Sequence, residues 1–199
     1  MHQTAARPAG VVDFPLRHIC VSGLPPATLA VIEQRLRHVR VSTEMSALPE
    51  CDLLVIDRSA EGVRDIIRWV QAAVAEFPVI LCTSTSDPLA MAEAIRTILF
   101  EDRSGWLRTQ HAGGVRLEML EAATMGLVVG RRSKCLLADA RADARHLGAA
   151  FERHGLASAA TLAAEAEQLL STPFADTRRL ATIVVALRNE LSLRSVVHA

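Results

Sequence analysis

Residues 52–57 read Asp-Leu-Leu-Val-Ile-Asp, and this stretch decides the fold. A short, continuous apolar run is typical of a parallel β-strand that helices cover on both faces. Two other stretches repeat the pattern: Arg17–Ser22 reads R-H-I-C-V-S, and Pro78–Thr83 reads P-V-I-L-C-T. The sequence therefore predicts a parallel sheet with residues 53–56 as its central strand.

Apolar residues at helical spacing lie between the expected strands. The three stripes are Leu29, Ile32, Leu36 and Val39; Val63, Ile66, Ile67, Val70 and Val74; and Leu89, Ala92, Ile95 and Leu99. Residues 40–43 fit a short edge strand, residues 105–109 a weaker strand, and residues 115–124 the helix after it. This alternation predicts an α/β fold: a flavodoxin-like, doubly wound parallel sheet of five strands.

The pattern changes after Gly126, where no further strand is expected. Three helices are predicted there: residues 136–151, stopped by Gly155; residues 161–170; and a last helix capped by Thr172-Pro173. The charge changes as well, from a small acidic excess before this point to a small basic excess after it. We therefore expect three parts: a flexible tail at 1–14, a sheet domain at 15–128 and a small all-α C-terminal module at 129–199.

The composition excludes several classes of protein. Half of the 199 residues are hydrophobic and 22 basic residues balance 22 acidic ones, which disfavours a disordered chain and a strongly basic nucleic-acid binder. The four cysteines form no C-x-x-C pair and are expected to be reduced thiols. The N-terminus lacks a signal-peptide pattern, and no segment is apolar for long enough to span a bilayer. We expect a soluble cytoplasmic protein with no membrane partner.

Polar residues at the expected strand ends match the phosphorylation site of a known family. Asp57 closes the D-L-L-V-I-D stretch, Thr83 follows five residues after Pro78, and Gly105–Thr109 reads G-W-L-R-T. In these features residues 16–127 resemble the receiver domain of bacterial response regulators. The resemblance implies that Asp57 stands at the phospho-acceptor position, Thr83 at the position of the hydroxyl that contacts the phosphoryl group, and Trp106 at the aromatic switch position.

The departures from the receiver pattern concern charge. Receivers carry paired carboxylates after the first strand, because Mg²⁺ prefers hard oxygen ligands, whereas this chain has Ser22-Gly23. Receivers carry a lysine at the end of the fifth strand, whereas this chain has Thr109, and Lys134 is its single lysine. Phosphoryl transfer depends on such metal and cation stabilisation. We therefore expect a degenerate phospho-acceptor pocket without metal, cofactor or catalytic residue, formed by Ser22, Gly23, Asp57, Thr83 and Thr109.

These residues also have plain structural roles open to them. Asp57 can cap the turn that follows it, and the hydroxyls of residues 83–86 can cap the next helix. Trp106 can be a packing residue at an edge. The sequence leaves both interpretations open.

The C-terminal module has a second, shorter resemblance. Phe151–Gly155, which reads F-E-R-H-G, is similar to the hydrophobic-x-Arg-x-Gly stretch of ANTAR-type transcription antiterminators, which bind RNA. The family's downstream alanine and leucine fall on Thr161 and Glu165, so the match is short. The resemblance implies contact with RNA, or with DNA, through residues 129–199; the candidate contacts are Arg131, Arg132, Lys134 and Arg153. A solvated linker is the alternative for the first three.

The function expected from these patterns is regulatory and non-enzymatic. A phosphorylation-independent response-regulator receiver domain, of the kind used in two-component signalling, would be coupled to a helical output or dimerisation module in transcription regulation. Its signal would come from a partner protein or a small molecule. The alternatives are an ANTAR-type RNA-binding antiterminator and a small enzyme on a flavodoxin-like sheet.

The last predicted helix carries a wide apolar stripe. Consecutive apolar residues fan around it, so packing against one neighbour leaves surface to cover. This predicts a homodimer through the last helix; the alternative is that the sheet domain covers the surplus within one chain. The stripe consists of Leu180, Ile183, Val184, Leu187, Leu191 and Val196.

Overall fold

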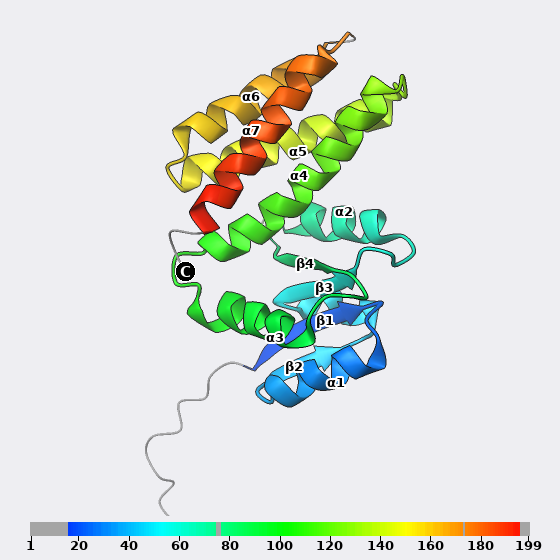
Figure 1. Cartoon of the computed structure of the whole chain (residues 1–199), viewed down its shortest axis with the longest axis vertical. Helices are drawn as coiled ribbons and strands as arrows, with labels where there is room; N and C mark the ends of the chain where they lie inside the picture. Colours follow the sequence, from blue (N-terminus) through cyan, green and yellow to red (C-terminus); the bar gives the residue numbers. More distant parts are fainter. Residues whose placement is uncertain (1–15, 75–76, 173, 196–199) are drawn as a thin grey trace, which may run out of the picture.

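The computed structural model describes residues 16–74, 77–172 and 174–195 (Figure 1). The expected tail at 1–14 and Val196 lie outside the described residues. In the described ranges the chain forms a parallel sheet with helices on both faces and a bundle of four helices beside it.

The sheet contains four parallel strands in the order β2-β1-β3-β4. This is the order of the first four strands of a flavodoxin-like sheet. Strand β3 lies between β1 and β4, with Val55 beside Val21 on one side and Ile80 on the other. Its four apolar residues are fully buried, which confirms residues 53–56 as a central strand. The strands are β1 (Arg17–Ser22), β2 (Val39–Ser42), β3 (Leu53–Asp57) and β4 (Val79–Cys82).

Helices cover the two faces of the sheet because side chains alternate along each strand. One face packs against α1 (Pro26–Arg35) and α3 (Pro88–Arg96), and its core includes Ile32, Val55 and Ile95. The other face packs against α2 (Val63–Ala73) and the short 3₁₀ helix η1 (Met45–Glu50), and its core includes Leu54 and Ile67. A π-helical turn, η2 (Thr97–Glu101), extends α3.

The expected fifth strand at residues 105–109 is wrong, because these residues begin the long helix α4 (Trp106–Val128). Gly105, at φ +72°, turns the chain into the helix, and the hydroxyl of Ser104 accepts a hydrogen bond from the Trp106 backbone at 3.2 Å. Asp102 accepts another from the Arg108 backbone at 2.9 Å. Acceptors of this kind satisfy the free N–H groups at the start of a helix. The pattern of residues 105–109 alone did not indicate this helix start.

Helix α4 lies along the free edge of β4, where a fifth strand would otherwise lie (Figure 1). Val115 of α4 joins the core that contains Val79 of β4. A helix over a sheet edge shields the backbone groups of that edge from unwanted pairing. The sheet therefore ends at four strands, and α4 lies beside the outer edge of β4.

The other side of α4 packs into a four-helix bundle with α5 (Lys134–Arg153), α6 (Ala157–Leu170) and α7 (Thr177–Ser195). Leu120, Leu147 and Phe151 are buried at its centre. The three helices expected after Gly126 are confirmed, but the last begins later than predicted. Asp176, not Thr172-Pro173, caps it by accepting the Arg179 backbone N–H at 3.0 Å. None of the helices in the described ranges combines the length and apolar character needed to cross a membrane.

The described part of the last helix's apolar stripe, from Leu180 to Leu191, is covered within one chain. The buried core of the bundle, where α4 and α6 contact α7, contains five of its residues: Leu180, Ile183, Val184, Leu187 and Leu191. Val185 is the large apolar residue of α7 that remains exposed among the residues described. The other bundle helices, rather than the sheet domain, thus bury the apolar surface of α7 for which a dimer was expected.

A buried ion pair connects the sheet layer to the bundle. Arg116 of α4 contacts the carboxylate of Asp143 on α5 at 3.2 Å and donates a hydrogen bond to the backbone carbonyl of Gln71 on α2 at 3.1 Å. The Gln71 side chain returns a hydrogen bond to the carbonyl of Ala112 at 3.2 Å. Three helices are therefore joined by polar groups that water barely reaches.

Removing one partner of this pair should be costly. We predict that Arg116→Met destabilises the protein by about 3–5 kcal/mol, because it leaves a carboxylate buried without a cation. The double variant Arg116→Met/Asp143→Leu should regain most of this loss. Urea unfolding of the two variants and the natural chain measures both values; a double variant no more stable than the single one would contradict the role of the charge.

The same pair makes stability depend on pH. Burial raises the pKa of Asp143 to about 6, and the nearby Arg116 charge only partly opposes this. The native carboxyl therefore binds its proton more tightly than the unfolded one, whose pKa is about 3.9. The stability that this tighter proton binding contributes is complete below about pH 4 and is lost as the pH rises through 6. Between about pH 5 and 7.5 the natural chain should lose about 1 kcal/mol relative to Asp143→Asn. Urea unfolding at several pH values measures this difference, and the same pH dependence of the unfolding free energy in both proteins would contradict the prediction.

Candidate functional site

The carboxyl ends of the strands bring part of the expected pocket together. Ser22 ends β1 and pairs in register with Ile56, while Asp57 ends β3 and pairs with Cys82, the residue before Thr83. Ser22, Asp57 and Thr83 therefore lie at one edge of the sheet, as the sequence predicted from parallel strands.

The carboxylate of Asp57 is engaged by the turn that follows it. The backbone N–H and the hydroxyl of Ser59 donate hydrogen bonds to the same Asp57 oxygen, at 2.7 and 2.5 Å. These bonds lower the pKa of Asp57 from its usual value, since they favour the charged form. Asp57 is only 4% exposed. It thus takes the turn-capping role that the sequence left open.

Gly23 closes the space beside Asp57. It has φ +76°, and a Cβ atom at this position would lie 3.1 Å from the Cβ of Asp57 and 3.3 Å from that of Ala60. The loop after β1 therefore packs its backbone directly against the aspartate.

Thr83 belongs to a small cluster of hydroxyls before α3. Its hydroxyl lies 3.0 Å from that of Thr85 and 3.3 Å from that of Ser86, and its backbone N–H donates to Ser86 at 2.9 Å. Asp87 then caps α3 by accepting the backbone N–H groups of Leu89 and Ala90. These contacts shape the turn into the helix and are the interactions that the structure assigns to Thr83.

Thr109 does not lie at this edge, so its expected place in the pocket is wrong. No fifth strand forms there, and Thr109 points from α4 toward α5, where its hydroxyl lies 3.0 Å from the Nε2 atom of His154. Trp106, one turn earlier, packs edge-on against the same imidazole with ring centroids 5.1 Å apart. Both residues are nearly inaccessible. Trp106 is a packing residue of the bundle.

The basic residues suggested for nucleic-acid contact fall into two places. Arg131, Arg132 and Lys134 lie exposed in the α4–α5 connection and the first turn of α5. Arg153 ends the same 20-residue helix, about 30 Å away at 1.5 Å per residue. The four residues therefore do not form one surface. In the F-E-R-H-G stretch, Phe151 is buried in the bundle, and Gly155, at φ +69°, lies just past the end of α5.

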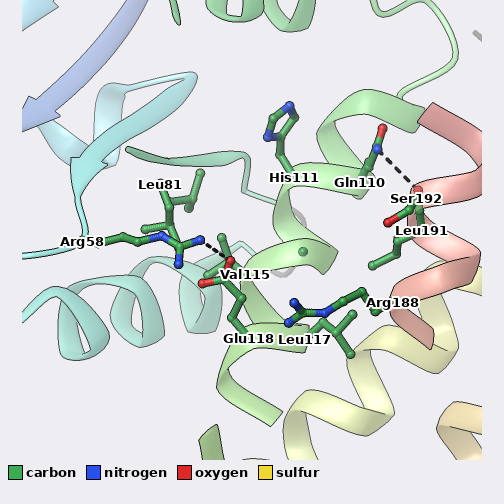
Figure 2. A pocket seen from close by; sticks show the side chains of 12 residues that line it. Arg58, Leu81, Gln110, His111, Val115, Leu117, Glu118, Arg188, Leu191 and Ser192 are labelled. Atoms are coloured by element: carbon green, nitrogen blue, oxygen red, sulfur yellow. Dashed lines mark hydrogen bonds and ion pairs between the residues drawn. The ribbon is translucent and has the colours of Figure 1, made fainter. Parts of the chain in front are cut away.

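A cavity of about 370 Å³ opens between β4, α4 and α7 (Figure 2). The sequence did not reveal it, because its walls come from elements far apart in the chain and a strand at 105–109 with a shorter helix at 115–124 was expected where α4 lies. Arg58, which forms an ion pair with Glu118, and Arg188, which pairs with Glu121, flank it. The other polar lining residues are Gln110, His111 and Ser192, and the apolar ones include Val79, Leu81, Val115, Leu117 and Leu191.

Hydrogen-bonding groups of two kinds face this cavity. The Leu54 N–H donates to Pro78 and the Arg58 N–H to Cys82, so the backbone groups of Leu81 face away from β3, toward α4. Burial lowers the pKa of His111, so its imidazole is neutral at pH 7 and can both donate and accept. The cavity is suited to a small polar molecule. In the described ranges, no group of three His, Cys, Asp or Glu side chains is placed to hold a metal ion.

The thiol next to Asp57 is not prepared for nucleophilic chemistry. Burial, together with the negative charge of Asp57, raises the pKa of Cys82 to about 11. A reactive cysteine needs a lowered pKa, because the thiolate is the nucleophile. The strand ends thus offer neither an activated thiol nor a free carboxylate among the residues described.

Comparisons with protein-family models, with curated proteins and with solved structures find no match for this chain. Its class is therefore defined by the fold and the site. It has a parallel α/β sheet whose carboxyl edge is closed around Asp57, and α4 connects the free edge of that sheet to a four-helix bundle.

The close approach at Gly23 can be tested directly. We predict that Gly23→Ala destabilises the protein by about 1–2 kcal/mol, since it forces a side chain into a left-handed conformation and against Asp57. Gly114→Ala is the matched control, because Gly114 lies within α4 and a Cβ there meets nothing within 4 Å. The control should be neutral or stabilising by up to about 1 kcal/mol. Equal midpoint temperatures of thermal unfolding for Gly23→Ala and Gly114→Ala would contradict the prediction.

Proposed function

We propose that this chain is a non-enzymatic, cytoplasmic regulatory protein in which a degenerate, phosphorylation-independent receiver-like domain acts through a helical output module. The observation that carries the proposal is the state of Asp57. Its carboxylate accepts two hydrogen bonds from Ser59, and Gly23 packs against its Cβ. Among the residues described, no group of three His, Cys, Asp or Glu side chains is placed to hold the metal ion that a receiver needs.

The cations of the chain support the same conclusion. Lys134, the single lysine, lies at the start of α5 and not at the strand ends. Arg58 follows Asp57 directly, but its guanidinium is paired with Glu118 of α4. A phosphoryl group on Asp57 would therefore lack the charge stabilisation on which phosphoryl transfer depends.

Helix α4 supplies the connection between input and output. It lines the cavity beside β4, packs against the sheet through Val115 and forms one wall of the bundle core. A small polar molecule in the cavity, or a partner protein over its mouth, would contact α4 and thereby act on both layers. We propose such a ligand or partner as the signal that replaces phosphorylation.

The alternatives have less support. A homodimer through α7 would have to use other residues than the described part of the apolar stripe, since that part is buried within one chain. An RNA-binding surface across residues 129–199 would have to combine the α4–α5 connection with Arg153 at the far end of α5. An enzyme at the strand ends would have to use Cys82 and Asp57, which are respectively protonated and already bonded.

We predict that small phosphodonors with Mg²⁺ do not phosphorylate Asp57. Intact-mass measurement of the natural chain and of Asp57→Asn, after incubation with acetyl phosphate, should show no added phosphoryl group on either. A stoichiometric acyl phosphate on the natural chain that is absent from Asp57→Asn would overturn the proposed function. Thermal stabilisation of the natural chain, but not of Asp57→Asn, by the phosphoryl analogue beryllium fluoride would also overturn it.

A further inference from the structure

Two loops meet at the end of the bundle that lies farthest from the sheet (Figure 1). One connects α4 to α5 and the other connects α6 to α7. The guanidinium of Arg132 lies over the ring of Phe174, 5.9 Å from its centroid, so the two loops are in contact. We call this surface the bundle tip; it consists of Met125, Val128, Val129, Arg131, Arg132, Lys134 and Phe174.

The bundle tip exposes large apolar side chains. Phe174 is 83% exposed and Val129 is 67% exposed, and more than half of Met125 and of Val128 is in contact with solvent. These are four of the ten exposed large apolar residues in the described ranges. A gathering of such residues at one end of a molecule marks an interaction surface.

The charges of the bundle tip are all of one sign. Arg131, Arg132 and Lys134 are exposed, and the sequence contains no acidic residue from 122 to 138 or from 168 to 175. The nearest carboxylate of the second loop, that of Asp176, accepts a backbone hydrogen bond at the start of α7. The tip therefore presents exposed cations around exposed apolar side chains.

We propose that the bundle tip docks on an anionic lipid surface. Apolar side chains that project between cations suit a membrane interface, where the side chains enter the headgroup region and the cations meet anionic headgroups. A nucleic acid would use the cations and stack on Phe174, but it would leave the aliphatic side chains of Val128 and Val129 without a partner. Such docking is peripheral and reversible, and it is independent of the proposed function.

The test is co-sedimentation of the full chain with vesicles. One set consists of phosphatidylcholine, and the other contains about one third phosphatidylglycerol, which supplies the anionic surface. We expect binding to the anionic vesicles alone, weakened by high salt. Each cation near a membrane surface contributes about fivefold in affinity, so Arg131→Glu/Arg132→Glu should lower binding at least tenfold. Phe174→Ser should lower it severalfold.

Matched variants separate the bundle tip from net charge and general apolarity. Arg35→Glu/Arg37→Glu makes the same charge change on exposed residues at α1, and Val185→Ser removes an exposed apolar side chain from the middle of α7. Both should bind as the natural chain does. Equal losses in these controls, equal binding to neutral vesicles, or no vesicle binding would overturn the proposal. Retention of a short single-stranded RNA in place of vesicles would also overturn it and assign the tip to nucleic acid.

Discussion

The guanidinium of Arg116 is the group on which the joining of the two layers depends. It is buried between α2, α4 and α5, and it contacts a carboxylate of the bundle and a carbonyl of the sheet layer together. A charge in such a place must keep its partners, because losing one leaves the other unpaired away from water. Arg116 stands on α4 beside Val115, which joins the core of the sheet layer, and Leu117, which joins the core of the bundle.

Helix α4 takes the place of a strand, and the shape of the molecule follows from this. A fifth strand would have paired with the outer edge of β4 and ended the sheet domain there. A helix shields the edge without pairing with it, so a cavity remains beside Leu81, and the helix continues far enough to become part of the bundle. The sheet and the bundle therefore share one element.

The carboxyl edge of the sheet is closed around Asp57. Asp57 stays at its strand end, but the turn through Ser59 takes its carboxylate and Gly23 fills the adjacent space. Both contacts lie within a few residues of strand ends, where short loops are held by the strands themselves. Groups available for recognition lie elsewhere, at the cavity beside α4 and at the bundle tip.

The sequence alone predicted the strands within 17–22, 52–57 and 78–83, because each is a continuous apolar run of the kind that a parallel sheet buries on both faces. It also determined that Asp57 and Thr83 share an edge, because parallel strands end together. The stretch 105–109 was ambiguous: its apolar residues suit a strand, yet Trp106 and Thr109 are one turn apart on a helix. The helix depends on tertiary contacts, because the bundle and His154 bury Trp106 and Thr109 on one side of it. Five residues of sequence cannot specify such contacts.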